Sequence, residues 1–188
     1  MRSATLASAV TDEDHAQGPA GAAITLVQYG DYGCPYTRLS GHSVHQLQRE
    51  FPDTLRFVLR HFPLEVDKIH PHARAASAAA EAAAQQTDFW TMHAYLFEHQ
   101  QALEDADLKR YAVELGLDSD RFACDRTTPE VETRIDRGLA SGERSGIQGT
   151  PTFYVNGIRN DGGYDLERLR SAILAHIDGR AHAHSRHA

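Results

Sequence analysis

Apolar and polar positions along the chain predict strands near both ends and helices between them. Residues 23–29 are rich in strand formers and predict a strand, and residues 55–62 predict a second one. Between these segments apolar residues recur at helical spacing until Pro52, which predicts a helix that begins after Cys34. A strand, a helix and a strand in close succession favour a right-handed βαβ unit with a parallel strand pair.

The middle of the chain, from His72 to about Gly146, contains no pattern typical of a strand. Five helices are expected there instead, at residues 73–84, 89–97, 107–115, 118–124 and 128–145.

Strand-like residues return after this helical stretch. Residues 151–155 predict a strand, Asn156-Gly157 favours a hairpin turn, and residues 158–159 predict a short partner strand. Apolar residues at helical spacing between Leu166 and Ile177 predict a last helix. The pattern as a whole therefore predicts an α/β chain with a helical insertion.

Composition and charge narrow the classes of function. The hydrophobic share of 41% and charged share of 24% are typical of a chain with a packed core. The formal net charge of −7, without a cluster of basic residues, argues against nucleic acid as a partner. We find no signal peptide and no apolar stretch long enough to span a membrane, so the sequence predicts a cytoplasmic protein without membrane association.

The junction between the first predicted strand and its helix carries a cysteine. Cys34 is followed by Pro35, Tyr36 and Thr37. The first turn of a helix has N–H groups without intrahelical partners, and the aligned peptide dipoles favour a thiolate over a neutral thiol. The position therefore predicts that Cys34 is a nucleophile.

Four segments in fixed order carry a family resemblance. They are Tyr-Gly-Asp-Tyr-Gly-Cys-Pro-Tyr at 29–36, Arg-His-Phe-Pro-Leu at 60–64, His-Pro-His-Ala at 70–73 and Gly-Thr-Pro-Thr-Phe-Tyr-Val-Asn-Gly at 149–157. Together they resemble the DsbA-like branch of the thioredoxin superfamily, over about residues 22 to 175. The resemblance implies an α/β thioredoxin-like fold with an all-helical insertion between the second and third core strands.

This resemblance and the hydrophobic pattern together suggest a division of the chain. The expected parts are a flexible leader at 1–21, the first part of the thioredoxin core at 22–66, the helical insertion domain at 67–147, the second part of the core at 148–178 and a flexible His-rich tail at 179–188.

The resemblance also implies site residues. Thr150-Pro151 matches a cis-proline loop that faces the active cysteine and binds an extended substrate segment. Considered alone, Pro151 favours a trans proline at the start of a strand. Beside the cysteine motif, we favour the cis loop.

The chain departs from the family pattern at Thr37, which stands where the second cysteine is expected. Threonine cannot resolve a mixed disulfide, although its hydroxyl could donate a hydrogen bond to the Cys34 sulfur. Pro35 and Tyr36 are expected to support the site. An external thiol must then release the captured partner.

The second cysteine of the chain, Cys124, falls in the predicted helical insertion. We expect it to be a packing residue rather than a partner of Cys34. Two cysteines exclude a disulfide-dense scaffold and do not resemble a zinc site of paired thiolates.

Other polar candidates have structural explanations. His70 and His72 lie at a predicted helix entrance, and the tail histidines have no evident scaffold, so we expect no metal site. Asp31 is either a proton acceptor near the thiol or a strand-end residue in solvent. The aromatic residues at helical spacing are expected to lie mostly in the core; they are Phe89, Trp90, Tyr95 and Phe97.

These features lead to one main hypothesis, a monothiol enzyme of thiol–disulfide exchange whose partners are protein or small-molecule thiols and disulfides. It needs no tightly bound cofactor, and glutathione is a candidate co-substrate. The alternatives are a redox-inactive peptide-binding or chaperone-like module of the same fold, or a glutathione-dependent transferase or isomerase relative. The sequence does not determine the oligomeric state.

Overall fold

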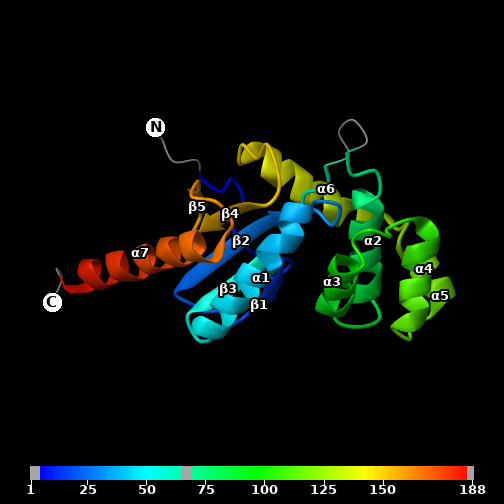
Figure 1. Cartoon of the computed structure of the whole chain (residues 1–188), viewed down its shortest axis with the longest axis horizontal. Coiled ribbons are helices and arrows are strands. Elements are labelled where there is room, and N and C mark those ends of the chain that lie inside the picture. The colour runs from blue at the N-terminus through cyan, green and yellow to red at the C-terminus, as the bar shows by residue number, and fades with distance from the viewer. Residues whose placement is uncertain (1–4, 65–68, 186–188) are drawn as a thin grey trace.

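Five strands form one mixed sheet in the computed structural model, which describes residues 5–64 and 69–185, with side chains up to residue 179 (Figure 1). The strand order is β1 (His15–Gln17), β3 (Leu55–His61), β2 (Ile24–Gly30), β4 (Thr152–Val155) and β5 (Ile158–Asn160). Strands β2 and β3 run parallel, and the other neighbours are antiparallel.

Seven helices are described in this part of the chain. They are α1 (Pro35–Glu50), α2 (Ala73–Ala84), α3 (Phe89–Glu98), α4 (Asp105–Glu114), α5 (Ser119–Asp125), α6 (Pro129–Arg144) and α7 (Leu166–Ser185). The predicted βαβ unit is confirmed as β2–α1–β3, and the predicted helical stretch is confirmed as α2 to α6. Those helices lie between β3 and β4, which are the second and third strands that the sequence predicted.

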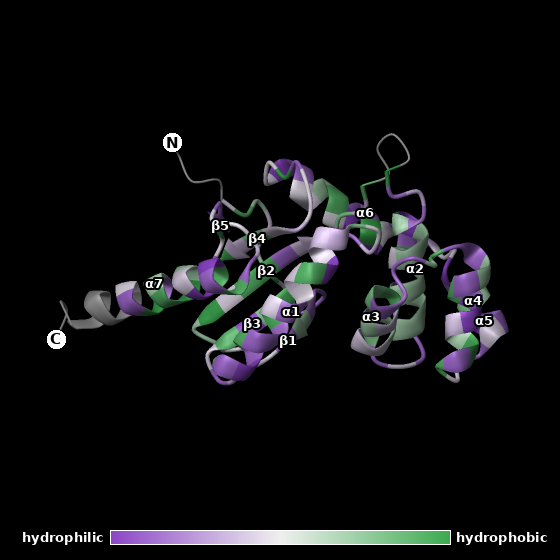
Figure 2. Ribbon diagram, in the orientation of Figure 1, coloured by the Kyte–Doolittle hydropathy of each residue, from purple (hydrophilic) through white to green (hydrophobic). Residues whose placement is uncertain are grey.

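The central strands are buried on both faces because helices cover the sheet on both sides. Alternate side chains of a strand point to opposite faces, so Leu26 joins a core cluster with Leu47 of α1 and Leu169 of α7. Its neighbour Val27 joins a second cluster on the other face, with Ile147 after α6. Figure 2 shows the matching apolar stretches along β2 and β3.

Helix α6 connects the sheet to the inserted helices. Val131 and Ile135 pack with Ala78 of α2. On the same helix, Gly138 lies so close to β3 that an added Cβ would be 2.4 Å from the carbonyl oxygen of His61. The sequence predicted a helical insertion domain at 67–147, which contains all of α6. That division of the chain stays a prediction.

The predicted flexible leader at residues 1–21 is wrong for its described part. His15–Gln17 form the edge strand β1, antiparallel to β3. The preceding segment is held by the buried guanidinium of Arg60, which contacts the carboxylate of Asp14 at 2.8 Å and two backbone carbonyls. The sequence did not show this strand because it is three residues long and has no alternating pattern.

The expected tail at 179–188 is helical as far as Ser185, because α7 continues to that residue, and its flexibility stays a prediction. Residues 186–188 lie outside the described part of the chain. None of the helices described combines the length and the apolar character that crossing a bilayer requires.

The contact between α6 and β3 can be tested by adding a single methyl group. Gly138→Ala should lower the free energy of unfolding by about 1–3 kcal/mol, because the backbone oxygen of His61 cannot move aside as a flexible side chain could. Urea unfolding followed by circular dichroism measures the change.

The matched control is Gly41→Ala on α1, where an added Cβ meets no atom within 4 Å. The free energy of unfolding of this variant should rise by about 0.5–1 kcal/mol, because alanine has a better helix propensity than glycine. Equal effects at the two glycines would contradict the close approach of α6 to β3.

Candidate active site

Cys34 is the N-cap residue of α1, immediately after the loop that leaves β2. It is 4% exposed and has an extended backbone, with Pro35 in the first turn of the helix. No side chain caps this helix end. The unpaired N–H groups of the first turn therefore place the positive end of the helix dipole beside the thiol, as the sequence predicts.

The loop before Cys34 is built around the buried carboxylate of Asp31. This carboxylate accepts the N–H groups of Gly33 at 2.7 Å and Leu64 at 2.9 Å, and it lies 2.8 Å from Nδ1 of His70. Because Asp31 is 1% exposed, the expectation of a solvated strand-end residue is wrong. Its three partners explain why the loop after β2 and the chain after β3 stay together, and they give His70 the expected structural role.

The Thr150–Pro151 peptide is cis, so the alternative of a trans proline is wrong. The Cys34 sulfur lies 3.1 Å from the carbonyl oxygen of Thr150, within reach of a hydrogen bond from the thiol S–H. The hydroxyl of Thr150 is buried without a hydrogen-bond partner among the described residues. The two segments that the resemblance assigned to one site are therefore in contact.

Thr37 is buried beneath Cys34 and makes a different contact from the one expected. Its hydroxyl oxygen accepts the backbone N–H of Asp31 at 3.4 Å, and Thr37 is 1% exposed. Among the described contacts, none joins this hydroxyl to the Cys34 sulfur. Thr37 thus helps to hold the loop before Cys34, and its expected role toward the sulfur stays a prediction.

The first turns of α1 after Cys34 expose two large apolar side chains beside the charged Arg38. Tyr36 is 55% exposed and Leu39 is 53% exposed, although both are large hydrophobic residues of α1. The ring of Tyr36 lies 5.8 Å from that of Tyr164, measured between centroids. A partner that reaches Cys34 would therefore meet exposed apolar side chains.

Gln100 is a site residue that the sequence did not reveal. Its side-chain amide donates to the backbone oxygens of Tyr32 at 2.7 Å and Cys34 at 2.9 Å, and the residue is buried. Gln100 follows α3, far from Cys34 in the sequence, and no pattern marks it. The inserted helices thus position the active loop directly.

A second link between the insertion and the loop joins Tyr32 to His93. The Tyr32 hydroxyl lies 3.0 Å from Nδ1 of His93. Burial lowers the pKa of His93 to about 3, and the charges of His61 and His15 add smaller effects. Burial also raises the pKa of Tyr32 well above its usual value, and the charge of Glu81 raises it further. Both side chains are therefore neutral near pH 7.

Cys124 does not pair with Cys34. Both cysteines are free; Cys34 is buried, whereas Cys124 is exposed on α5. The structure thus supplies no second thiol at the Cys34 site.

The aromatic residues of α3 have the core role that was expected for most of them. Phe89 is buried, and Trp90, Tyr95 and Phe97 pack partly buried against the main cluster. Trp90 and Phe97 also line a groove of about 510 Å³ that extends along α1 to Thr37.

Replacing Gln100 by leucine should uncouple the active loop from the insertion. Gln100→Leu keeps the side-chain size but leaves the buried carbonyls of Tyr32 and Cys34 without their donor, which should cost about 1–3 kcal/mol of stability. Urea unfolding measures this loss, and Gln101→Leu, at an exposed neighbour, is the control. Equal stability of the two variants would contradict the role of Gln100.

The buried His93 should make stability fall in mild acid. Its pKa is about 3 in the folded chain against 6.5 for an unperturbed histidine, so the unfolded chain binds more protons between these values. Stability that is present above pH 6.5 should be lost as the pH falls toward 3, at up to about 1.4 kcal/mol per pH unit. Denaturant unfolding at a series of pH values measures the slope.

His93→Phe should flatten this slope, because phenylalanine keeps the ring contacts but does not titrate. His45→Phe, at an exposed position of α1, should leave the slope unchanged. The absolute stability of His93→Phe is not informative, since the Tyr32 hydroxyl loses its partner. An unchanged slope in His93→Phe would show that other groups cause the acid sensitivity.

Comparisons with known proteins agree with this geometry. The family model described as thioredoxin matches residues 10–175. The Na(+)/H(+) antiporter NhaA 3 of Salinispora tropica is 42% identical over 164 residues, which cover 87% of this chain and 25% of that protein. The chain thus spans about a quarter of the length of the curated relatives it matches.

Solved structures show the same fold. A thioredoxin-like oxidoreductase from Silicibacter pomeroyi DSS-3 has 28% identity and a TM-score of 0.78, over 88% of this chain and 92% of that one. Oxidised BdbD from Bacillus subtilis has 20% identity and a TM-score of 0.76, over 88% of this chain and 93% of that one. The chain therefore belongs to the thioredoxin family and has the DsbA-like form of its fold, with a helical insertion.

Proposed function

We propose that the chain is a monothiol thiol–disulfide oxidoreductase that acts through a mixed disulfide at Cys34. One observation carries this proposal: Cys34 lies at the uncapped start of α1 against the cis Thr150–Pro151 peptide, while Thr37 occupies the position of a resolving thiol. The thioredoxin family and the likeness to a solved thioredoxin-like oxidoreductase support the general class of reaction.

The reaction is a pair of thiol–disulfide exchanges. The Cys34 thiolate attacks one sulfur of a substrate disulfide, forms a mixed disulfide with it and releases the other sulfur as a thiolate. An external thiolate then attacks the captured substrate sulfur, forms a new disulfide and releases Cys34 as a thiolate. No net oxidation occurs, because every disulfide broken is replaced by another.

The surroundings of Cys34 favour an extended polypeptide as the disulfide substrate. The backbone of the Thr150–Pro151 loop offers an edge to an extended chain, and the exposed Tyr36 and Leu39 offer apolar contacts. Glutathione is the candidate for the external thiol. A cytoplasmic location stays a prediction from the sequence.

Trapping of glutathione tests the mechanism. Incubation with oxidised glutathione should add one glutathionyl group at Cys34, detected by intact and peptide mass spectrometry, and excess reduced glutathione should remove it. Cys34→Ser should abolish the adduct. Cys124→Ser is the matched control and should retain it, because Cys124 lies on a different helix.

A second variant tests the meaning of Thr37. Thr37→Cys should form an internal disulfide and release the glutathione that the parent chain retains. Failure of the parent to form any adduct at Cys34 would overturn the proposal. Partner binding that survives Cys34→Ser would instead favour a redox-inactive binding module.

A further inference from the structure

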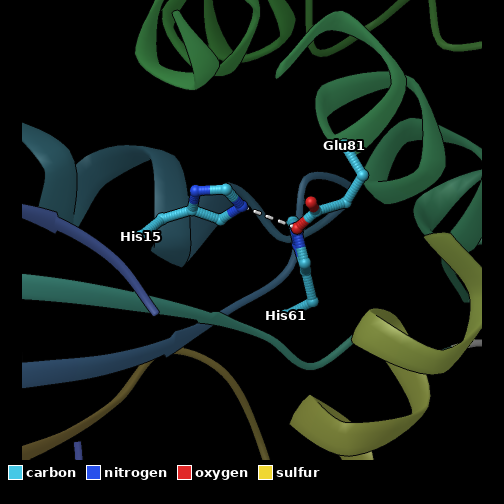
Figure 3. Close-up of side chains that lie close together, drawn as sticks. All are labelled: His15, His61 and Glu81. Atoms are coloured by element: carbon cyan, nitrogen blue, oxygen red, sulfur yellow. Dashed lines mark hydrogen bonds and ion pairs between the residues drawn. The ribbon is translucent and has the colours of Figure 1, made fainter. Parts of the chain in front are cut away.

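Three side chains that the thiol chemistry does not use meet on the wall of one cavity. His15 comes from β1, His61 from the end of β3 and Glu81 from α2, as Figure 3 shows. Their ligand atoms all lie within 4.8 Å of one another. The cavity that they line has a volume of about 250 Å³.

The carboxylate of Glu81 is the centre of this cluster. Its Oε1 atom lies 2.8 Å from Nε2 of His15 and 2.8 Å from Nε2 of His61. The side chain of Glu81 is 2% exposed and that of His61 is 5% exposed, whereas that of His15 is 18% exposed. The cluster is thus buried but open on the side of β1.

We propose that His15, His61 and Glu81 form a binding site for one divalent transition-metal ion, with zinc as its natural occupant. Two imidazole nitrogens and one carboxylate oxygen form a donor set that binds zinc, cobalt and related ions in preference to magnesium or calcium. Three protein ligands leave further positions for water from the cavity.

The two contacts of the Glu81 carboxylate oxygen fit such an ion with little movement. With ligand bonds of about 2.0–2.1 Å, a nitrogen and an oxygen 2.8 Å apart subtend about 90° at the metal, which suits five or six ligands. A tetrahedral ion needs about 0.5 Å more separation between the same atoms. On binding, each neutral ring coordinates through Nε2 and carries its proton on Nδ1.

The arginines around the cavity are compatible with a bound cation. Arg134 contacts the other carboxylate oxygen of Glu81, Oε2, at 3.3 Å, which leaves Oε1 for the metal and orients the carboxylate. Arg60 and Arg137 also line the cavity, and each is paired with a carboxylate. The charges of Arg60 and Arg137 are thus offset by these carboxylates, whereas Arg144, which also lines the cavity, contacts the hydroxyl of Ser8.

The expectation that the chain binds no metal rested on His70, His72 and the tail histidines. None of those residues belongs to this cluster. The cluster depends on β1, which the sequence did not predict, and on the packing of α2 against the end of β3. Sequence spacing therefore gives no indication of it.

Cobalt binding to the full-length chain tests the site. Titration with Co²⁺ should show one ion per chain, with visible absorption bands and without the intense charge-transfer band of a thiolate ligand. His15→Phe should weaken binding at least tenfold, because it removes one ligand. The variant keeps a ring stacked on Phe89, as the His15 ring is stacked now at 3.5 Å between centroids.

Zinc provides a second measurement. A saturating concentration should raise the melting temperature of the parent chain but not that of His15→Phe. Glu81→Gln should also lose binding; if that variant does not fold, His15→Phe decides the question, since His15 lies on an edge strand and is the least buried ligand.

Two controls separate this site from adventitious binding by other histidines. His45→Ala removes an exposed histidine of α1, and a variant with His182, His184 and His187 replaced by alanine removes those of the tail. Both should retain the cobalt site. Unchanged binding in His15→Phe, loss of binding in either control, or no binding by the parent at micromolar cobalt would each overturn the proposal.

Discussion

The buried carboxylate of Asp31 is the interaction on which the thiol site depends. It joins the loop after β2 to the chain after β3 through the N–H groups of Gly33 and Leu64, and to His70. A buried carboxylate is tolerated only when donors replace the water it loses. Because these donors come from separate segments, the carboxylate fixes where α1 begins and thus where Cys34 lies.

Buried polar contacts also attach the remaining segments to the sheet. Arg60 holds the chain before β1 through Asp14, and Glu81 holds β1 and β3 to α2 through two histidines. The parallel register pairs Gly30 with His61, so the end of β2 and the Glu81 cluster are neighbours. The N-terminal segment and the insertion are thus connected to the sheet near the ends of β2 and β3, where the thiol loop also begins.

Periodic apolar residues made most of the fold predictable from the sequence. The β2–α1–β3 unit, the helices from α2 to α6 and the cis proline loop follow from hydrophobic spacing or from the family motifs. Strand β1 could not be predicted in this way, because its stability comes from pairing with β3 and from the charge of Arg60. Gln100 was hidden for a related reason: a single polar side chain acquires its role from tertiary packing, which leaves no periodic signal.

In the proposed mechanism, the position of Thr37 bears on how a captured partner is released. Its side chain is buried beneath Cys34, with its hydroxyl on the Asp31 backbone, and its methyl group lies 3.0 Å from where a Cβ on Gly30 would be. Thr37 is also one of the residues that line the groove of about 510 Å³ along α1. In the mechanism proposed above, the exposed side chains of Tyr36 and Leu39 are open both to the captured substrate and to the resolving thiol. On that proposal, a small external thiol is favoured over a bulky one, because the resolving thiol and the substrate chain share this surface.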